Sequence, residues 1–460
     1  MDGDGGGSTQ LQPSGRELAE QSEHHRPDSQ RRKVRAIGVS SNLGVSPSLW
    51  QIAFMATIFF LISFWLHFPG LTPNNYTDLM DTLWPRIHQA SGIVPYRDYN
   101  LEYPAISALA LYVSSLWRNM YGFYFTMSAI LLLCMLVAVL FVSKILAATG
   151  LSVQRLTYFV IFTPSFIYFS VYSFDWIGAS LMVASIYFAL ARRVKLSGIS
   201  LGLAVAARII PAVCLPFLLY SFKKSKNIRL FLLSTACAWL AANLYFIFTN
   251  LHGFLYPYVY QAGFYAEDSW LNILPSEMAK ILSVILLCSL LGLIMIWRKR
   301  FNLVQQSLLA LLAFVVVSYK FPPQYMILLL PLFALNAVAY GEFMTANILD
   351  VMLILWYFSP MFNLGNSVSP LSPVQWIAMA RQFILAVVFV RLFLSSRKSV
   401  VLSDREAQRE RRASHGTRVK GARVPLPSET GSAPRSSTGR RATAASIVSP
   451  TATVRKRSPS

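Results

Sequence analysis

Charge is scarce in this chain of 460 residues: only 13% of them are Asp, Glu, Lys or Arg, while 55% are hydrophobic. The positive mean hydropathy excludes an ordinary soluble domain and indicates an integral membrane protein. Cysteine is scarce as well. The four cysteines stand singly in apolar runs, which excludes the paired spacing of a zinc site and predicts core residues: Cys134, Cys214, Cys237 and Cys288.

The features of a cleaved signal peptide are also missing before the first apolar run. About 48 polar residues precede that run, and no small-residue cleavage pattern follows it. We therefore expect residues 49–68 to stay as a first membrane span, because their number suits about 30 Å of hydrocarbon. Similar runs predict further spans at 120–142, 156–172, 175–190, 197–209, 210–221, 230–249, 279–297, 302–318, 322–338, 345–362 and 374–394.

These runs predict an all-α polytopic transmembrane bundle with about 11–12 membrane segments. We interpret the short pair around Pro211 as a broken hairpin, because proline removes a helix hydrogen bond and each half is too short to span alone. The apolar stretch 104–117 is also too short for a crossing, so it is expected to be re-entrant or interfacial.

The formal charge of +21 is concentrated in the ends of the chain. Residues 397–460 hold 15 Lys or Arg against 4 Asp or Glu, and residues 1–48 are rich in Gly, Ser and Gln. Both segments are predicted to be disordered cytoplasmic tails that flank a transmembrane domain at 49–396. The basic C-terminal tail is expected to attract anionic lipid and not nucleic acid.

Short basic loops predict the orientation of the bundle. They lie between Lys144 and Arg155, at 192–195, at 223–229 and at 298–300, and all fall on one side, which is therefore expected to be cytoplasmic. Two longer segments fall on the other side. We name them the first outer loop (69–119) and the second outer loop (250–278).

Ionisable side chains at membrane depth are costly and usually line a cavity or pair with a partner. Asp78 and Asp81 lie three residues apart in the first outer loop, where an α-helix would place them on one face. Asp175, Arg208 and Lys320 fall at turns on the same side of the bundle. This convergence predicts a site for a lipid-linked phosphate donor, in which the two cations hold the phosphate and Asp78 acts as general base.

Each of these residues also has a plain structural interpretation. Asp78 and Asp81 could belong to a solvated loop helix, and Asp175 could cap the helix that follows it. Arg208 and Lys320 could extend to lipid headgroups without any ligand. The charged residues Arg97, Asp98 and Glu102 could pair with one another. The aromatic residues of the second outer loop could bind a sugar or form an interfacial belt: Tyr256, Tyr258, Tyr260, Tyr265 and Trp270.

The sequence resembles the GT-C superfamily of multispan glycosyltransferases. The segment "YTDLMDTLWPRIHQASGIVPYRDYNLEYPAISAL" is similar to the first outer loop of the GPI mannosyltransferase I catalytic subunit and of prokaryotic polyprenol-phosphate-mannose-dependent mannosyltransferases. In that pattern an acidic motif precedes a Gly-x-x-Pro-Tyr turn, and Asp78 here lies 17 residues before Pro95. Three further segments match in order: "SVYSFDWIGASLMVASIYFAL", "LAVAARIIPAVCLPFLLY" and "SYKFPPQYMILLLPL".

The resemblance implies a hexosyltransferase, with mannose as its sugar, that uses a polyprenyl-phosphate donor and inverts the anomeric centre. It also implies a glycolipid, glycan or protein acceptor on the non-cytoplasmic side of a prokaryotic plasma membrane or of the endoplasmic reticulum, and it leaves a small membrane subunit open as a partner. The GPI-type enzyme has Asp-x-Asp where this chain has Asp78-Leu-Met-Asp81. We therefore prefer a metal-independent base, with a divalent cation left open.

Asp78 is accordingly the predicted catalytic residue. The predicted substrate-binding residues are Asp81, Asp98, Glu102, Tyr103, Asp175, Arg208, Lys320, Gln324 and Tyr325. A secondary transporter or lipid flippase is the main alternative, since buried charges and broken helices also mark transport pathways. The chain lacks the two related halves that are usual in such proteins. A noncatalytic GT-C-like subunit is a third hypothesis.

Overall fold

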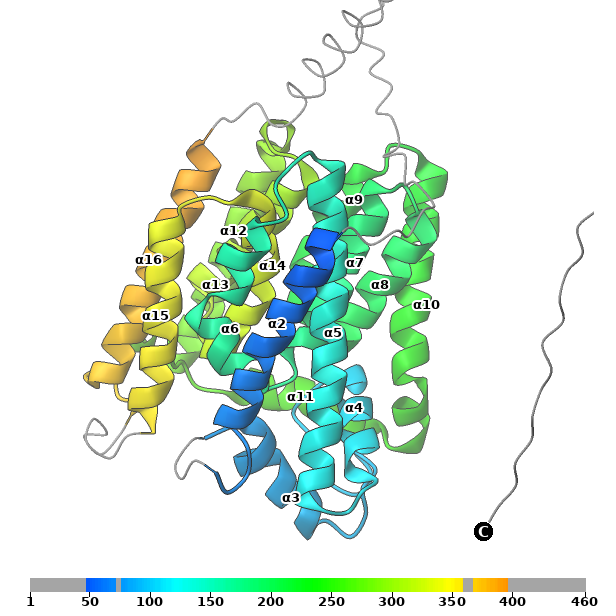
Figure 1. Ribbon diagram of the computed structural model, residues 1–460, viewed down its shortest axis with the longest axis vertical. Helices are drawn as coiled ribbons and strands as arrows, with labels where there is room; N and C mark the ends of the chain where they lie inside the picture. Colours follow the sequence, from blue (N-terminus) through cyan, green and yellow to red (C-terminus); the bar gives the residue numbers. More distant parts are fainter. Residues whose placement is uncertain (1–46, 72–75, 359–366, 396–460) are drawn as a thin grey trace, which may run out of the picture. The chain divides into compact units, whose positions relative to one another are not determined.

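The computed structural model describes residues 47–71, 76–358 and 367–395 (Figure 1). Within these ranges the chain forms helices and connecting turns and no named strand, which confirms the predicted all-α fold. The two predicted disordered tails lie outside the described residues, except that residues 47 and 48 begin the first described helix. The last part of the predicted span at 345–362 also lies outside them.

Five helices of the described part are long and apolar enough to cross a membrane, which indicates a membrane protein. They are α2 (Pro47–Leu66), α5 (Met120–Ala148), α10 (Ser225–Thr249), α12 (Ser276–Ile296) and α16 (Pro373–Leu394). The other predicted spans correspond to shorter or less apolar helices, so the expected number of 11–12 membrane segments stays a prediction.

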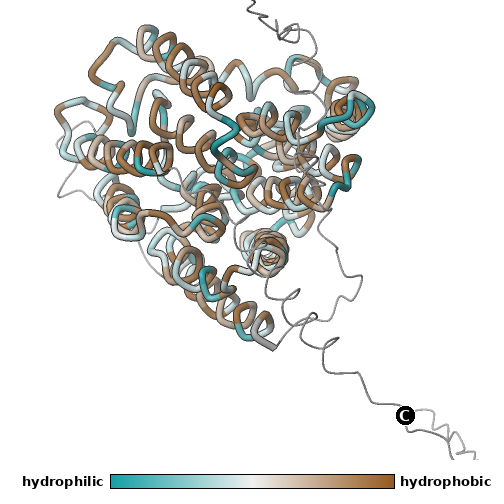
Figure 2. Tube along the Cα trace, turned by 90° about the horizontal axis from the view of Figure 1, so that it is seen from above, coloured by the Kyte–Doolittle hydropathy of each residue, from teal (hydrophilic) through white to brown (hydrophobic). Residues whose placement is uncertain are grey.

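Shorter helices fill the centre of the bundle. α7 (Asp175–Leu190), α13 (Leu303–Val317) and α14 (Met326–Asn336) are buried along almost their whole length, since apolar residues occupy every side of them. α10 and α12 instead expose large apolar side chains such as Leu233 and Ile281. Figure 2 shows hydrophobic residues on the peripheral helices as well as in the centre, an arrangement suited to contact with lipid.

Two of the predicted spans are broken in the structure. Residues 156–172 form a π-helical turn (Thr157–Ile161) and then α6 (Pro164–Phe169). The break falls at Thr163, whose hydroxyl caps α6, and Pro164 occupies the first turn, where proline is tolerated. Residues 322–338 likewise begin with a 3₁₀ turn (Pro323–Tyr325) before α14.

The predicted hairpin around Pro211 is present in the structure. α8 (Val194–Ala207) is followed by a 3₁₀ turn (Ile210–Cys214) and by α9 (Leu215–Ser221), which runs back toward the start of α8. The cysteines differ from expectation. Cys214 in the hairpin is buried and Cys134 is partly buried, but Cys237 and Cys288 are exposed on α10 and α12. The prediction of four core cysteines is therefore wrong for these two.

The four basic loops meet at one end of the bundle. Arg192 donates a hydrogen bond of 2.9 Å to the carbonyl of Ser221, which joins the loop before α8 to the loop after α9. The guanidinium of Arg298 lies 4.0 Å from the centre of the Tyr220 ring, which adds the loop after α12. Lys144, near the end of α5, contacts the last turn of α7. The start of α7 and the end of α8 therefore lie toward the opposite end.

Differences in helix length create a recess at that opposite end. At about 1.5 Å per residue, α5 is about 43 Å long, whereas α7 and α8 extend only about 24 and 21 Å from the basic end. The first outer loop contains a π-helical turn (Asp78–Leu83), α3 (Trp84–Gln89) and α4 (Ala105–Ser115). In Figure 1, α3 and α4 lie at one end of the bundle. Ser107 of α4 donates a hydrogen bond to the carbonyl of Ala207 at the hairpin tip, at 2.9 Å.

The remaining helices complete the recess. The second outer loop contains α11 (Leu251–Gly263) and a 3₁₀ turn (Trp270–Ile273). α15 (Tyr340–Tyr357) packs against α16 and α6 and also contacts the turn that precedes α14. A further 3₁₀ turn (Arg298–Arg300) connects α12 to α13 at the basic end.

This arrangement predicts which positions lie on opposite sides of a membrane. We expect Lys224→Cys, at the basic end, and Glu277→Cys, at the start of α12, to react with a membrane-impermeant thiol reagent from opposite sides. Labelling of intact and permeabilised cells measures this, with the unsubstituted chain and its four native cysteines as control. Labelling of both variants from the same side would contradict the two-ended arrangement.

Candidate functional site

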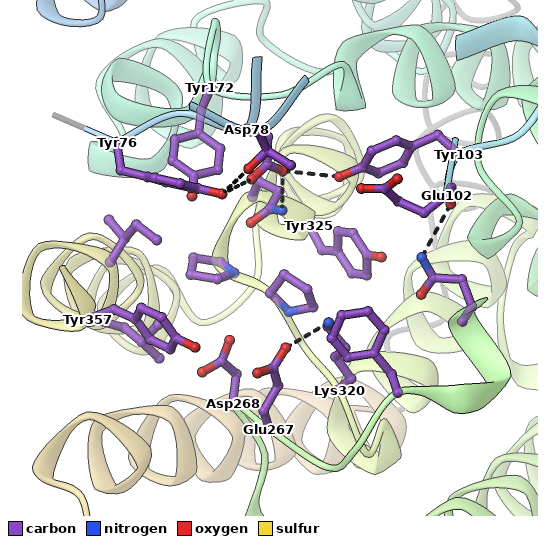
Figure 3. A pocket seen from close by; sticks show the side chains of 18 of the residues that line it. Tyr76, Asp78, Glu102, Tyr103, Tyr172, Glu267, Asp268, Lys320, Tyr325 and Tyr357 are labelled. Atoms are coloured by element: carbon purple, nitrogen blue, oxygen red, sulfur yellow. Dashed lines mark hydrogen bonds and ion pairs between the residues drawn. The ribbon is translucent and has the colours of Figure 1, made fainter. Parts of the chain in front are cut away.

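A pocket of about 280 Å³ lies in the recess (Figure 3). Its volume is close to the lower limit of small-molecule sites, about 300 Å³. The first outer loop, the second outer loop, the turn before α14 and α15 all contribute to it. Its lining includes Tyr76, Asp78, Glu102, Tyr103, Tyr172, Arg208, Tyr260, Gln261, Phe264, Glu267, Asp268, Lys320, Pro322, Pro323, Gln324, Tyr325, Leu353, Ile354, Tyr357 and Phe358.

Asp78 is held on one wall of the pocket by the π-helical turn. Thr77 caps that turn with its hydroxyl, which accepts a hydrogen bond of 3.0 Å from the backbone of the third residue after it. The Asp78 carboxylate is 9% exposed and accepts hydrogen bonds from Gln324 at 3.1 Å and from the hydroxyls of Tyr76 and Tyr103, both at 3.4 Å. Burial raises the pKa of Asp78 to about 7, although the nearby positive charge of Arg208 opposes that rise.

Asp81 does not line the pocket, and the expectation that it shares a face with Asp78 is wrong. Its side chain is exposed, and its carboxylate accepts a hydrogen bond of 2.6 Å from the backbone of Thr77. The segment is a π-helical turn, in which each turn contains more residues than in an α-helix, so side chains three positions apart diverge. Asp81 therefore stabilises the turn that presents Asp78.

Asp98 also lies outside the pocket. Its carboxylate accepts hydrogen bonds of 2.8 Å from the backbone of Val94 and from Arg97, and these contacts stabilise the loop. Glu102 does line the pocket and pairs with Arg86, so the expected pairing among the three charged loop residues is correct only for Arg97 and Asp98.

Arg208 ends α8 and reaches the pocket next to Asp78. Its guanidinium is 2.8 Å from the carboxylate of Asp175 and donates a hydrogen bond of 3.2 Å to Ser173. Asp175 lies outside the pocket lining and balances the charge of Arg208. Three aromatic rings lie within 4.7–5.3 Å of the guanidinium carbon: Tyr103, Phe174 and Tyr325. Arg208 is therefore largely occupied by protein partners.

Lys320 lies on the opposite wall, in the turn after α13. Its ammonium group is 2.6 Å from the carboxylate of Glu267, and the backbone of Glu267 donates a hydrogen bond of 3.1 Å to the carbonyl of Tyr319. Burial lowers the pKa of Lys320, whereas the charge of Glu267 opposes that change. In Figure 3 Asp78 faces Glu267, Asp268 and Lys320 across the cavity.

Glu267 and Asp268 were not among the predicted site residues. Burial raises the pKa of Asp268 to about 7, and the negative charge of Glu267 adds to this rise. A signal for both was present, because they form a pair of adjacent acids in a loop with few other charges, "YAEDSW". Of the five aromatic residues for which sugar binding or an interfacial belt was left open, only Tyr260 lines the pocket. The lining thus contains four carboxylates and two cations, and the described residues include no group of three His, Cys, Asp or Glu placed to hold a metal ion.

Arg381 of α16 binds the two loops that form the pocket wall around Lys320, one containing Asp268 and the other containing Phe321. We call this wall the Lys320 wall. It is fully buried and lies 2.5 Å from the carboxylate of Asp350 on α15, which is also fully buried. Its guanidinium donates hydrogen bonds to the carbonyl of Asp268 at 3.1 Å and to the carbonyl of Phe321 at 2.5 Å. This pair was not among the predicted site residues, although a lone Asp and a lone Arg inside two predicted spans are the signal for it.

Comparisons with other proteins assign no family to this chain. No protein-family model matches it, and neither curated proteins nor solved structures give a significant match.

The buried pair of Arg381 and Asp350 predicts that two arginine substitutions in α16 will differ strongly in their effect on the free energy of unfolding. We expect Arg381→Met to lower the free energy of unfolding by about 3–5 kcal/mol, because Asp350 would be left as a buried charge without its partner. Thermal unfolding of the detergent-solubilised protein measures this.

The matched control is Arg391→Met on the same helix. Arg391 pairs with Glu342 at a site that is largely exposed, so we expect a change of only about 0–1 kcal/mol. Equal effects of the two substitutions would contradict a stabilising role for the buried pair.

Proposed function

We propose that this protein is a membrane glycosyltransferase that moves a hexose from a polyprenyl-phosphate donor to an acceptor hydroxyl outside the cytoplasm. The observation that carries the proposal is the position of Asp78 and Lys320 on opposite walls of one pocket. In an inverting transfer the base and the leaving group act on opposite faces of the sugar ring. A sugar between these walls would have a base on one face and a cation on the other.

The reaction assigns a distinct task to each wall. Asp78 accepts the proton of the acceptor hydroxyl while the acceptor oxygen bonds to the anomeric carbon and the bond from that carbon to the phosphate oxygen breaks. A pKa of about 7 is suited to a general base at neutral pH. The departing polyprenyl phosphate keeps the electron pair of the broken bond, and its negative charge is stabilised by Lys320.

Arg208 has a different task from the one expected from sequence. Its pairing with Asp175 and its three aromatic neighbours make Arg208 a weaker candidate than Lys320 for holding the phosphate. Its proximity to Asp78 instead favours the ionised form of that carboxyl group. In this proposal Lys320 is the principal phosphate ligand and Arg208 adjusts the basicity of Asp78.

One wall of the pocket supports a lipid-linked donor. α15 contributes Leu353, Ile354 and Tyr357, and Phe358 follows at its end. These residues form an apolar side next to the charged ones and suit the first part of a polyprenyl chain. The resemblance of the first outer loop to GT-C enzymes supports the same donor class and mannose as its sugar. The acceptor in this proposal is a glycolipid, a glycan or a protein.

A proton-coupled secondary transporter is the second candidate. It is favoured by the excess of carboxylates over cations in the lining and by the two carboxyl groups with a pKa of about 7, which are features of transport pathways. Substrate uptake into proteoliposomes without any lipid-linked donor would support this candidate against the transferase.

The transferase proposal predicts that Asp78→Asn lowers kcat by about 10²- to 10⁴-fold, because the amide cannot accept the acceptor proton. Sugar transfer from polyprenyl-phosphate hexose in membranes measures this. Glu277→Gln is the control, since it makes the same carboxylate-to-amide change at an exposed position outside the pocket. Full activity of Asp78→Asn would remove the proposed base.

The same proposal predicts the direction of the pH dependence. Because the base acts in its ionised form, kcat/KM is expected to rise about tenfold per pH unit below pH 7 and to level off above it. Asp268 titrates in the same range, so the profile is also measured in Asp268→Asn, where the limb due to Asp78 should persist. A profile that is flat between pH 5 and 8 would contradict the assignment.

A further inference from the structure

Asp268 is held in an unusual backbone conformation at the edge of the pocket. Its φ is +54°, a left-handed value that costs free energy for a residue other than glycine and often occurs at functional sites. Gln375 accepts a hydrogen bond of 2.8 Å from the Asp268 backbone and donates one of 3.3 Å to its carboxylate. With Arg381 bound to the Asp268 carbonyl, α16 holds this residue on both sides.

The conformation directs the carboxylate into the cavity. In Figure 3 the Asp268 side chain points toward the interior of the pocket, between Glu267 and Tyr357. The neighbouring Glu267 pairs with Lys320, so Asp268 and the proposed phosphate ligand face the cavity from adjoining positions. The phosphate of the donor is attached to the anomeric carbon. Groups next to Lys320 therefore meet the part of the sugar next to that carbon.

We propose that Asp268 binds the hydroxyl on the carbon adjacent to the anomeric carbon of the donor sugar. The inference depends on the proposed function, and it narrows the donor to hexoses with a free 2-hydroxyl group. A carboxylate accepts a strong hydrogen bond from such a hydroxyl. That bond strengthens as positive charge develops on the sugar ring in the transition state, so Asp268 contributes to rate as well as to binding.

The groups that surround Asp268 are consistent with this task. Glu267 and Lys320 form an ion pair on one side, and Arg381 with its partner Asp350 lies behind the backbone. Among the described residues, the side-chain hydrogen bond to the Asp268 carboxylate comes from the Gln375 amide and reaches one carboxylate oxygen. A sugar hydroxyl adds a second donor.

The test combines removal of the carboxylate with removal of the hydroxyl. The full-length protein in proteoliposomes is given polyprenyl-phosphate hexose or its 2-deoxy analogue, and kcat/KM is measured for each. The ratio of kcat/KM for the parent donor to kcat/KM for the 2-deoxy donor should be about 10- to 100-fold larger in the wild type than in Asp268→Asn. This factor is the contribution expected of one hydrogen bond to a charged group. A 6-deoxy donor, which lacks a remote hydroxyl, should show the same relative rate in both proteins.

A second substitution at Asp268 controls for an effect of Asp268→Asn on folding. Asp268→Gly removes the carboxylate at a position where glycine adopts the positive φ without strain, so it should lose the same preference as Asp268→Asn. Glu277→Gln should keep the preference of the wild type.

Two failures can be told apart. An unchanged preference in both Asp268 variants would overturn the Asp268 assignment while leaving the transferase intact. No transfer by the wild type from either donor would overturn the proposed function itself.

Discussion

A cation inside an apolar helix bundle needs a carboxylate partner, because an unpaired buried charge costs several kcal/mol of folding free energy. Arg381 pairs with Asp350 between two helices, and this pair is fully buried. The same guanidinium binds the carbonyls of Asp268 and Phe321, so charge neutralisation in the bundle also fixes the two loops of the Lys320 wall. The geometry of the pocket therefore depends on an ion pair that lies outside the pocket lining.

Differences in exposure separate the roles of three cations, Arg381, Arg208 and Lys320. Arg381 is 0% exposed and outside the pocket lining, so its role is structural. Arg208 is 5% exposed and surrounded by aromatic rings and Asp175, which leaves it an electrostatic influence on Asp78. Lys320 is 17% exposed, and a flexible lysine stem allows its ammonium group to move between Glu267 and a ligand.

Hydropathy predicted helix positions well and side-chain directions poorly. The span predicted at 175–190 coincides with α7, because apolar length determines where such a helix ends. Asp81 faces away from Asp78 because the turn is π-helical, and sequence periodicity does not distinguish that turn from an α-helix. Asp268 was missed since its direction depends on a positive φ and on Gln375 and Arg381, both more than 100 positions away in the chain.

The binding of an anionic donor would affect the ionisation of Asp78, because the pocket is already rich in carboxylates. A phosphate beside Lys320 brings further negative charge to a lining that already has more carboxylates than cations, and this charge would raise the pKa of Asp78. A base whose pKa rises well above neutrality is protonated and inactive. Arg208 limits that rise, because its positive charge lowers the pKa of Asp78 and its own charge is balanced by Asp175. In the proposed transferase, separate cations for the base and for the leaving group would thus let the same pocket bind an anion and keep Asp78 ionised.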